Sequence, residues 1–273
     1  MGSLGQDTEL LGSNGSYTVT PSEDWRIWGP MGGYAASLAL RAAANHVPAD
    51  CVPASFSCQF FTPARFEPVD LEVVLRRSTR RTTAAAVTMT QNGKPVLDAQ
   101  SWFALEDEHV SHDHTTVHPH GDPFDHPDIT ELTDEKPPFP FWENFEGRPV
   151  DWVHDWDSYM GGEPTWAEWL RFLPDAEFGD PVLEACRLLI MADLPSFPAA
   201  SRAHPGASAP QWIAPNLDLS VQFHRLAGLG EWLLSSGVAP IAERGLIGFR
   251  SEVWTRDGLL AATGSGQLLT KAV

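Results

Sequence analysis

The stretch Trp28-Gly29-Pro30-Met31-Gly32-Gly33-Tyr34 runs directly into an alanine-rich segment, Ala35 to Asn45. Alanine and leucine dominate the segment, and both are strong helix formers. Since almost no polar face remains, we predict a helix that is buried on all sides rather than amphipathic. Such a helix requires a sheet that wraps around it.

Two glycines stand at the start of this helix. A helix N-terminus carries free N–H groups and partial positive charge, and glycine lets a ligand oxygen approach them closely. One interpretation is an oxyanion or carbonyl site with the N–H groups of Gly33 and Tyr34 as donors. Close packing of the helix start against a sheet explains the glycines equally well.

Composition excludes several classes of protein. The formal charge of −18 argues against nucleic acid and against an anionic membrane surface as partners, although a local basic patch can still bind a phosphorylated ligand. No apolar run reaches membrane-spanning length, and the first sixteen residues lack the features of a secretory signal. Cys51, Cys58 and Cys186 are odd in number and lie in apolar or strand-like settings, which predicts reduced thiols in a cytoplasmic protein.

Alternation of apolar and polar residues predicts β-strands on both sides of the middle of the chain. Asn92-Gly93 and Asp257-Gly258 mark two hairpin turns. The predicted strands cover residues 17–20, 55–61, 69–76, 85–90 and 95–105, then 217–224, 231–236, 246–255 and 259–269.

The region between these two sets of strands is acidic, proline-spotted and rich in histidine. Its histidines are His109, His112, His114, His118, His120 and His126. Alternating histidines can supply metal ligands, but no apolar framework fixes them, so we favour a solvated linker and predict no metal. We therefore divide the chain into residues 1–106, a linker over 107–136, and residues 137–273. The aromatic residues of 137–172 are read as core or interface, and Trp166, Trp169 and Phe172 suit one face of a helix or a strand.

The two halves repeat each other. A second helix is predicted after Asp180, a good N-cap, with Pro181 in its first turn. Cys58-Gln59-Phe60-Phe61 resembles Val221-Gln222-Phe223-His224, and the hairpin turn follows at nearly the same distance in each half. We predict a duplicated α+β unit whose sheets join edge to edge.

The halves differ where chemistry is expected. The first helix opens with glycines, whereas Pro181 lacks an N–H donor. Asp218 stands where the first half has Ser55, and Gln267 stands where it has Trp102. If the halves face each other, backbone donors from one meet a carboxylate and an amide from the other in one composite site.

Two stretches resemble the double-hotdog acyl-CoA thioesterases of the thioesterase II type. One is the Trp28–Tyr34 stretch with its helix, and the other runs Leu217-Asp218-Leu219-Ser220-Val221-Gln222-Phe223-His224-Arg225 and on through Glu231-Trp232-Leu233-Leu234. The resemblance implies two hotdog units, each a helix wrapped by an antiparallel sheet, and hydrolysis of fatty acyl-CoA to free acid and CoA. It implies no cofactor. Sheets of this kind often pair, which leaves a homo-oligomer open.

The resemblance also implies site residues. An aspartate, a glutamine and a hydroxyl would position a water molecule; Asp218 and Gln267 match the first two. The hydroxyl position falls at Ala239-Pro240-Ile241, where no hydroxyl exists. The carbonyl of the substrate would dock at Gly33 and Tyr34, next to Gly32, Trp28 and Met31. The CoA phosphates need cations, for which the candidates are Arg225 and the run Arg76, Arg77, Arg80 and Arg81.

Two other functions stay open on the same scaffold. The absent hydroxyl favours a non-catalytic protein that binds acyl-CoA or fatty acyl groups. A hydratase acting on enoyl-CoA would need an aspartate–histidine pair at a helix start, which Asp122-Pro123-Phe124-Asp125-His126 only faintly suggests.

Overall fold

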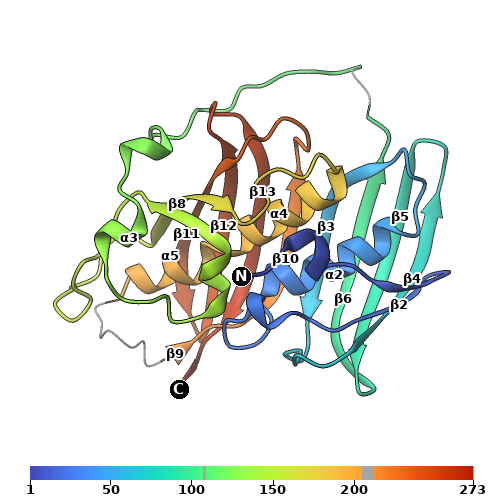
Figure 1. Cartoon of the computed structure of the whole chain (residues 1–273), viewed down its shortest axis with the longest axis horizontal. Coiled ribbons are helices and arrows are strands. Elements are labelled where there is room, and N and C mark those ends of the chain that lie inside the picture. The colour runs from blue at the N-terminus through green and yellow to red at the C-terminus, as the bar shows by residue number, and fades with distance from the viewer. Residues whose placement is uncertain (107–108, 205–211, 273) are drawn as a thin grey trace.

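The computed structural model describes residues 1–106, 109–204 and 212–272 (Figure 1). Twelve strands form one antiparallel sheet in the order β1-β2-β4-β5-β6-β3-β10-β13-β12-β11-β8-β7. The first half supplies β1 (Leu11–Ser13), β2 (Ser16–Val19), β3 (Val52–Phe60), β4 (Val69–Ser78), β5 (Thr82–Gln91) and β6 (Lys94–Ala104). The second half supplies β7 (Phe145–Pro149), β8 (Thr165–Phe172), β10 (Asn216–Phe223), β11 (Trp232–Glu243), β12 (Leu246–Thr255) and β13 (Leu260–Leu269). A separate two-stranded sheet pairs β9 (Trp212–Ile213) with β14 (Lys271–Ala272).

Two long helices, α2 (Gly32–Ala44) and α4 (Pro181–Asp193), lie side by side on one face of the sheet (Figure 1). They run antiparallel, because Gly33 lies against Ile190 at one end of the pair and Arg41 lies near Asp180 at the other. Most residues of both helices are buried, as the apolar composition predicts for α2; α4 also buries the charged residues Glu184, Arg187 and Asp193. The shorter elements are α1 (Leu4–Asp7), η1 (Glu23–Trp25), η2 (Pro123–Asp125), α3 (Ile129–Leu132), η3 (Pro140–Asn144) and α5 (Ser196–Arg202).

The predicted duplication is confirmed. Each half places a 13-residue helix before four consecutive strands of the sheet, and the two sheets join where β3 pairs with β10. An irregularity also repeats: β3 has a register shift between Pro53 and Ser55, and β10 has one between Asn216 and Asp218. This is the α+β double-hotdog arrangement that the sequence predicts.

The predicted hairpin turns are present as well. Asn92 and Gly93 have φ angles of 52° and 74°, as a two-residue turn with both central residues in the left-handed region requires. The aromatic segment around Trp169 is strand β8, so the helical interpretation is wrong. Trp169 packs with Trp232 and Trp254 in a small apolar cluster, while its strand neighbours point to the main core on the other face.

The histidine-rich region is less solvated than predicted. The His118 ring lies edge-on to Trp169 and Trp254, with ring centroids 5.3 and 5.6 Å apart. Two ion pairs, Asp113–Arg225 at 2.8 Å and Asp122–Arg256 at 2.6 Å, tie the same region to the second half. The region thus covers the tryptophan cluster. Within the described residues, no group of histidine, cysteine, aspartate or glutamate side chains is arranged to hold a metal ion.

Two further observations concern the chain as a whole. Among the described residues, no helix combines the length and the apolar character needed to cross a membrane. All three cysteines are free, buried thiols, and burial raises the pKa of Cys186 to about 12.

Candidate active site

The N-terminus of α2 is capped by a side chain from the other half of the molecule. Its own N-cap residue, Met31, offers no side-chain hydrogen bond. Instead the backbone N–H of Gly33 donates to Asp193 Oδ2 at 2.7 Å. Asp193 is the last residue of α4, so the antiparallel packing of the helices brings a carboxylate to the positive end of α2.

Asp193 is a buried carboxylate, only 5% exposed. Burial raises its pKa to about 6, against the lowering effect of hydrogen bonds from Asn216 and the Gly33 amide. The Asn216 side-chain amide donates to Asp193 Oδ1 at 2.5 Å. Among the described residues, no cation forms an ion pair with Asp193. A carboxylate in this state exchanges a proton close to neutral pH.

A β-bulge delivers Asn216 to this position. Asn216 of β10 lies opposite Leu268 of β13, and Asp218 lies opposite Gln267. Between these two pairs β10 advances by two residues while β13 advances by one. The extra residue in β10 lets Asn216 share the helix-facing side of the sheet with Leu219, although straight alternation would place them on opposite faces. Bulges re-aim side chains in this way next to functional sites.

The two glycines lie against different partners. A Cβ at Gly33 would lie 2.8 Å from Ile190 Cα, so glycine is needed for the close approach of the helices. A Cβ at Gly32 would lie 2.7 Å from Asp193 Oδ2 and 3.3 Å from Asn216 Nδ2. Gly32 therefore lets the start of α2 lie directly against the Asp193 carboxylate and the Asn216 amide. Both glycines permit close packing, and Gly33 packs against α4 rather than against a sheet.

A donor remains available beside Asp193. The Ala35 N–H group donates a hydrogen bond to Met31 O at 2.9 Å, which closes the first turn of α2. Within the described part of the chain, the N–H groups of Gly32 and Tyr34 make no hydrogen bond. Gly32 is also partly exposed. Tyr34 is fully buried, so the Gly32 N–H group is the one that an oxygen atom with negative charge can approach.

The structure places Asp218 and Gln267 side by side, but neither is a hydrogen-bond partner of the Gly33 amide. Asp218 and Gln267 are opposed in the ladder, but they lie on the face of the sheet away from the helices, where Gln267 is exposed. The Asp218 carboxylate accepts a hydrogen bond from the Gln267 backbone, which lowers its pKa, while burial raises the pKa by more. The Gly33 amide that they were to face is occupied by Asp193.

The other predicted residues have varied surroundings. The Tyr34 ring stacks on Trp25 at 5.2 Å, and its hydroxyl donates to Asp7 O at 2.7 Å, so the side chain belongs to the core. Met31 is buried too. Trp28 is 47% exposed and lies edge-on to Phe197 of α5. The remaining candidate, Arg225, is engaged, since its guanidinium donates to Asp113 Oδ2 at 2.8 Å and to Leu260 O at 2.6 Å.

The fold agrees with a known class, the hotdog thioesterases. The N-terminal domain of the acyl-CoA thioesterase family matches residues 21–104, and its C-terminal domain matches residues 115–269. The chain belongs to this acyl-CoA thioesterase family, whose activity is hydrolysis of thioesters. No curated protein matches the chain.

Solved structures share the fold over the full length. A conserved protein of unknown function with a hot dog fold from Alicyclobacillus acidocaldarius is 22% identical with a TM-score of 0.83, over 99% of this chain and 98% of that one. The acyl-CoA thioesterase II TesB2 from Mycobacterium marinum is 22% identical with a TM-score of 0.79, over 99% of both chains. The tesB protein of Mycobacterium avium subs paratuberculosis is 24% identical with a TM-score of 0.76, over 98% of both chains.

Proposed function

We propose that this protein hydrolyses acyl-CoA thioesters with a water molecule that Asp193 activates directly. The observation that carries the proposal is the buried, cation-free Asp193 carboxylate, whose pKa is raised to about 6 at the N-terminus of α2. A general base works best when its pKa lies near the operating pH, because it is then both deprotonated and basic enough to accept a proton.

The proposed reaction uses these groups as follows. Asp193 takes a proton from water as the water oxygen bonds to the thioester carbonyl carbon. Negative charge develops on the carbonyl oxygen, and the free N–H group of Gly32, with the positive end of α2, stabilises it. The C–S bond then breaks, the electron pair leaves with sulfur, and the proton held by Asp193 passes to the thiolate. Asn216 and the Gly33 amide hold the carboxylate in position throughout.

A covalent route has little support from the nucleophiles near the site. Burial and the negative charge of Asp193 raise the pKa of the Cys58 thiol well above its usual range, so little thiolate forms. The Ser37 hydroxyl donates to Gly33 O at 2.8 Å rather than to a base. We therefore assign attack to water itself.

The proposal is tested by measuring release of free CoA thiol from a panel of straight-chain acyl-CoAs. We expect steady-state turnover, and no acyl adduct in the mass of enzyme quenched during turnover. Binding of acyl-CoA without thiol release would show instead a binding protein on this scaffold. An acyl adduct that forms and decays at the turnover rate would contradict direct attack by water.

A further inference from the structure

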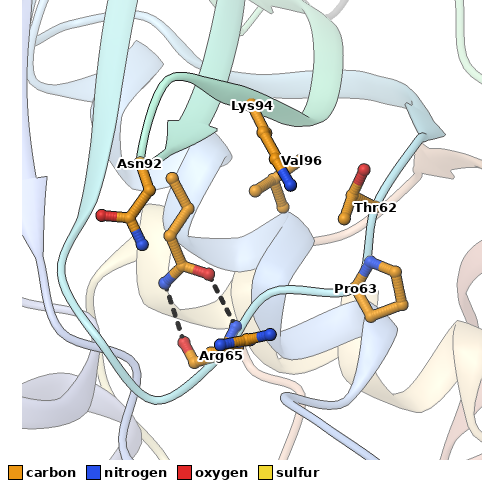
Figure 2. Close-up of a pocket in the computed structure, with 7 residues that line it drawn as sticks. Thr62, Pro63, Arg65, Asn92, Lys94 and Val96 are labelled. Carbon is orange, nitrogen blue, oxygen red and sulfur yellow. Dashed lines mark hydrogen bonds between the residues drawn. The ribbon is translucent and has the colours of Figure 1, made fainter.

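A hollow of about 170 Å³ lies at the end of the first-half sheet, beyond the last residue of β3 (Figure 2). Its walls come from the chain that follows β3 and from the β5–β6 turn. The residues that line it are Thr62, Pro63, Arg65, Gln91, Asn92, Lys94 and Val96. In Figure 2 the Lys94 side chain extends toward the space between Thr62 and Asn92, with Arg65 on the opposite side. The hollow therefore has a cation on two sides.

A buried amide fixes the shape of this hollow. The Gln91 side chain is held by three hydrogen bonds: Oε1 accepts from Arg65 N–H at 2.8 Å, and Nε2 donates to Arg65 O at 3.1 Å and to Glu67 O at 2.8 Å. Gln91 is itself only 7% exposed. The loop that carries Arg65 is thus anchored to β5, and the hollow belongs to the fold.

Its cations are unpaired in a strongly acidic chain. With a net charge of −18, carboxylates outnumber cations two to one, 36 against 18. Nevertheless, Arg65 and Lys94 form no ion pair with any described residue. The nearby Glu67 carboxylate accepts a hydrogen bond from the Asn92 side chain at 3.2 Å. Arg225, in contrast, is neutralised by Asp113.

The hollow lies at the same end of the sheet as Asp193 and Asn216. Phe61 N–H bonds Val96 O at 2.8 Å, and Gln59 of β3 lies opposite Asp218 of β10. Asn216 of β10 therefore lies beside the Phe61 region of the neighbouring chain segment. Val96, in the wall of the hollow, is on the strand beyond that, so Asn216 and Val96 are two strand spacings apart, roughly 10 Å. The same loop also contacts the segment before α2, because a Cβ at Gly29 would lie 3.3 Å from Ala64 O.

We propose that this hollow is an anion subsite that binds the phosphate groups at the nucleotide end of CoA. The inference rests on the proposed function for the identity of the ligand. An arginine and a lysine that converge on a preformed hollow suit phosphate oxygens through charge-assisted hydrogen bonds. The arginine run at 76–81 is excluded by position: Thr82 is level with Val52, at the other end of β3, roughly 25 Å away along the strand.

The test compares substrates with and without the nucleotide. In the double variant Arg65→Gln, Lys94→Gln, we expect KM for an acyl-CoA to rise at least tenfold with kcat within twofold. We expect no change with the corresponding acyl-pantetheine, which lacks the phosphates. The matched control, Arg76→Gln with Arg77→Gln, removes two cations from the other end of the sheet and should leave both substrates unaffected. An unchanged KM for acyl-CoA, or an equal loss with acyl-pantetheine, would overturn the subsite.

A binding measurement separates this inference from the proposed function. We expect CoA itself to bind the Asp193→Asn variant, and the Arg65→Gln, Lys94→Gln substitutions in that background to weaken binding at least tenfold. That loss would show the subsite even if the wild-type protein released no thiol. If those substitutions left the Kd for CoA unchanged, the hollow would not bind phosphate, whatever the protein hydrolyses.

Discussion

The two ends of the α2–α4 helix pair are related by the duplication. They differ in which helix contributes the aspartate that caps the helix start. At one end the start of α2 is capped by Asp193, which belongs to the other helix. At the other end the start of α4 is capped by its own Asp180, which accepts from Val182 N–H at 2.7 Å. Arg41 of α2 lies 3.9 Å from the Asp180 carboxylate. One end thus carries a carboxylate without a counterion, and the other carries an ion pair.

The equal lengths of the helices allow a comparison residue by residue. Both have 13 residues, so Asp193 at the end of α4 corresponds to Ala44 at the end of α2. Asp180 in turn corresponds to Met31. The Asp180 side chain is 45% exposed, whereas Asp193 is buried. The carboxylate at the start of α4 belongs to the same helix and is exposed, whereas the carboxylate at the start of α2 belongs to the other helix and is buried. Burial gives Asp193 the raised pKa that lets it accept a proton near neutral pH.

The largest expected difference between the two ends of the helix pair concerns stability. The unfolded Asp193 carboxyl ionises near its usual pKa of 3.8, and the native one near 6, so unfolding releases a proton between these values. The contribution of Asp193 to stability is therefore fully present below about pH 4 and is lost as pH rises through 6. Relative to Asp193→Asn, we expect the wild type to lose about 3 kcal/mol of unfolding free energy between pH 4 and pH 7. Urea unfolding at both pH values measures this. An equal pH dependence in the two proteins would contradict the shifted pKa.

The next effect is on catalysis and comes from crowding the Asp193 carboxylate at the start of α2. In Gly32→Ala the new methyl group meets Asp193 Oδ2 at 2.7 Å, so either the carboxylate or the helix start must move. We expect kcat/KM to fall about 100-fold, the size of effect that a displacement of about 1 Å produces. Pro181→Ala, the corresponding position of α4, is the matched control and should stay within twofold. Equal rates in both variants would show that the two helix starts do not differ in function.

A smaller effect is expected from Asn216→Leu. The hydrogen bond from the Asn216 side-chain amide lowers the pKa of Asp193. Loss of this hydrogen bond should raise that pKa and shift the acid limb of the kcat/KM profile to higher pH. At pH 6 we expect about a tenfold lower kcat/KM, because less carboxylate is ionised and it is less well held. The pH profile separates these causes from general damage. An acid limb that stays in place would show that Asn216 does not act on Asp193.

The smallest effect belongs to the other end of the pair. Asp180→Ala removes the N-cap of α4 and should cost about 1 kcal/mol of stability. We expect kcat and KM to stay within twofold of the wild type, since this end holds an ion pair rather than a reacting group. Thermal unfolding and steady-state kinetics on the same preparation check both parts. A large loss of turnover would place the active site at both ends.

Most of the fold follows from local sequence patterns. The helix predicted over residues 35–45 is observed at Gly32–Ala44, and the Asn92-Gly93 turn forms as expected. These features depend on helix propensity, strand alternation and turn residues, each of which acts over a few positions. The repeat was visible because the same patterns recur at the same spacing.

The site was harder to predict because it depends on contacts between distant residues. Asp193 is 160 positions from Gly33, and only the antiparallel packing of the helices joins them. Asp193 ends a buried helix that also contains the charged residues Glu184 and Arg187, so its charge alone does not single it out in the sequence. Asn216 was missed because strand alternation places it on the same face as Asp218, and only the bulge in β10 separates the two. Gly32 and Gly33 were identified, but their separate packing partners depend on tertiary contacts.

The assignment of the base is tested most directly by two aspartate substitutions measured side by side. Asp193→Asn and Asp218→Asn remove the same charge from opposite faces of the sheet. With both variants shown to be folded, we predict that Asp193→Asn lowers kcat for acyl-CoA hydrolysis about 1,000-fold, within the range for a general base, and that Asp218→Asn stays within threefold of the wild type. A large loss in Asp218→Asn together with a nearly normal rate in Asp193→Asn would contradict this account.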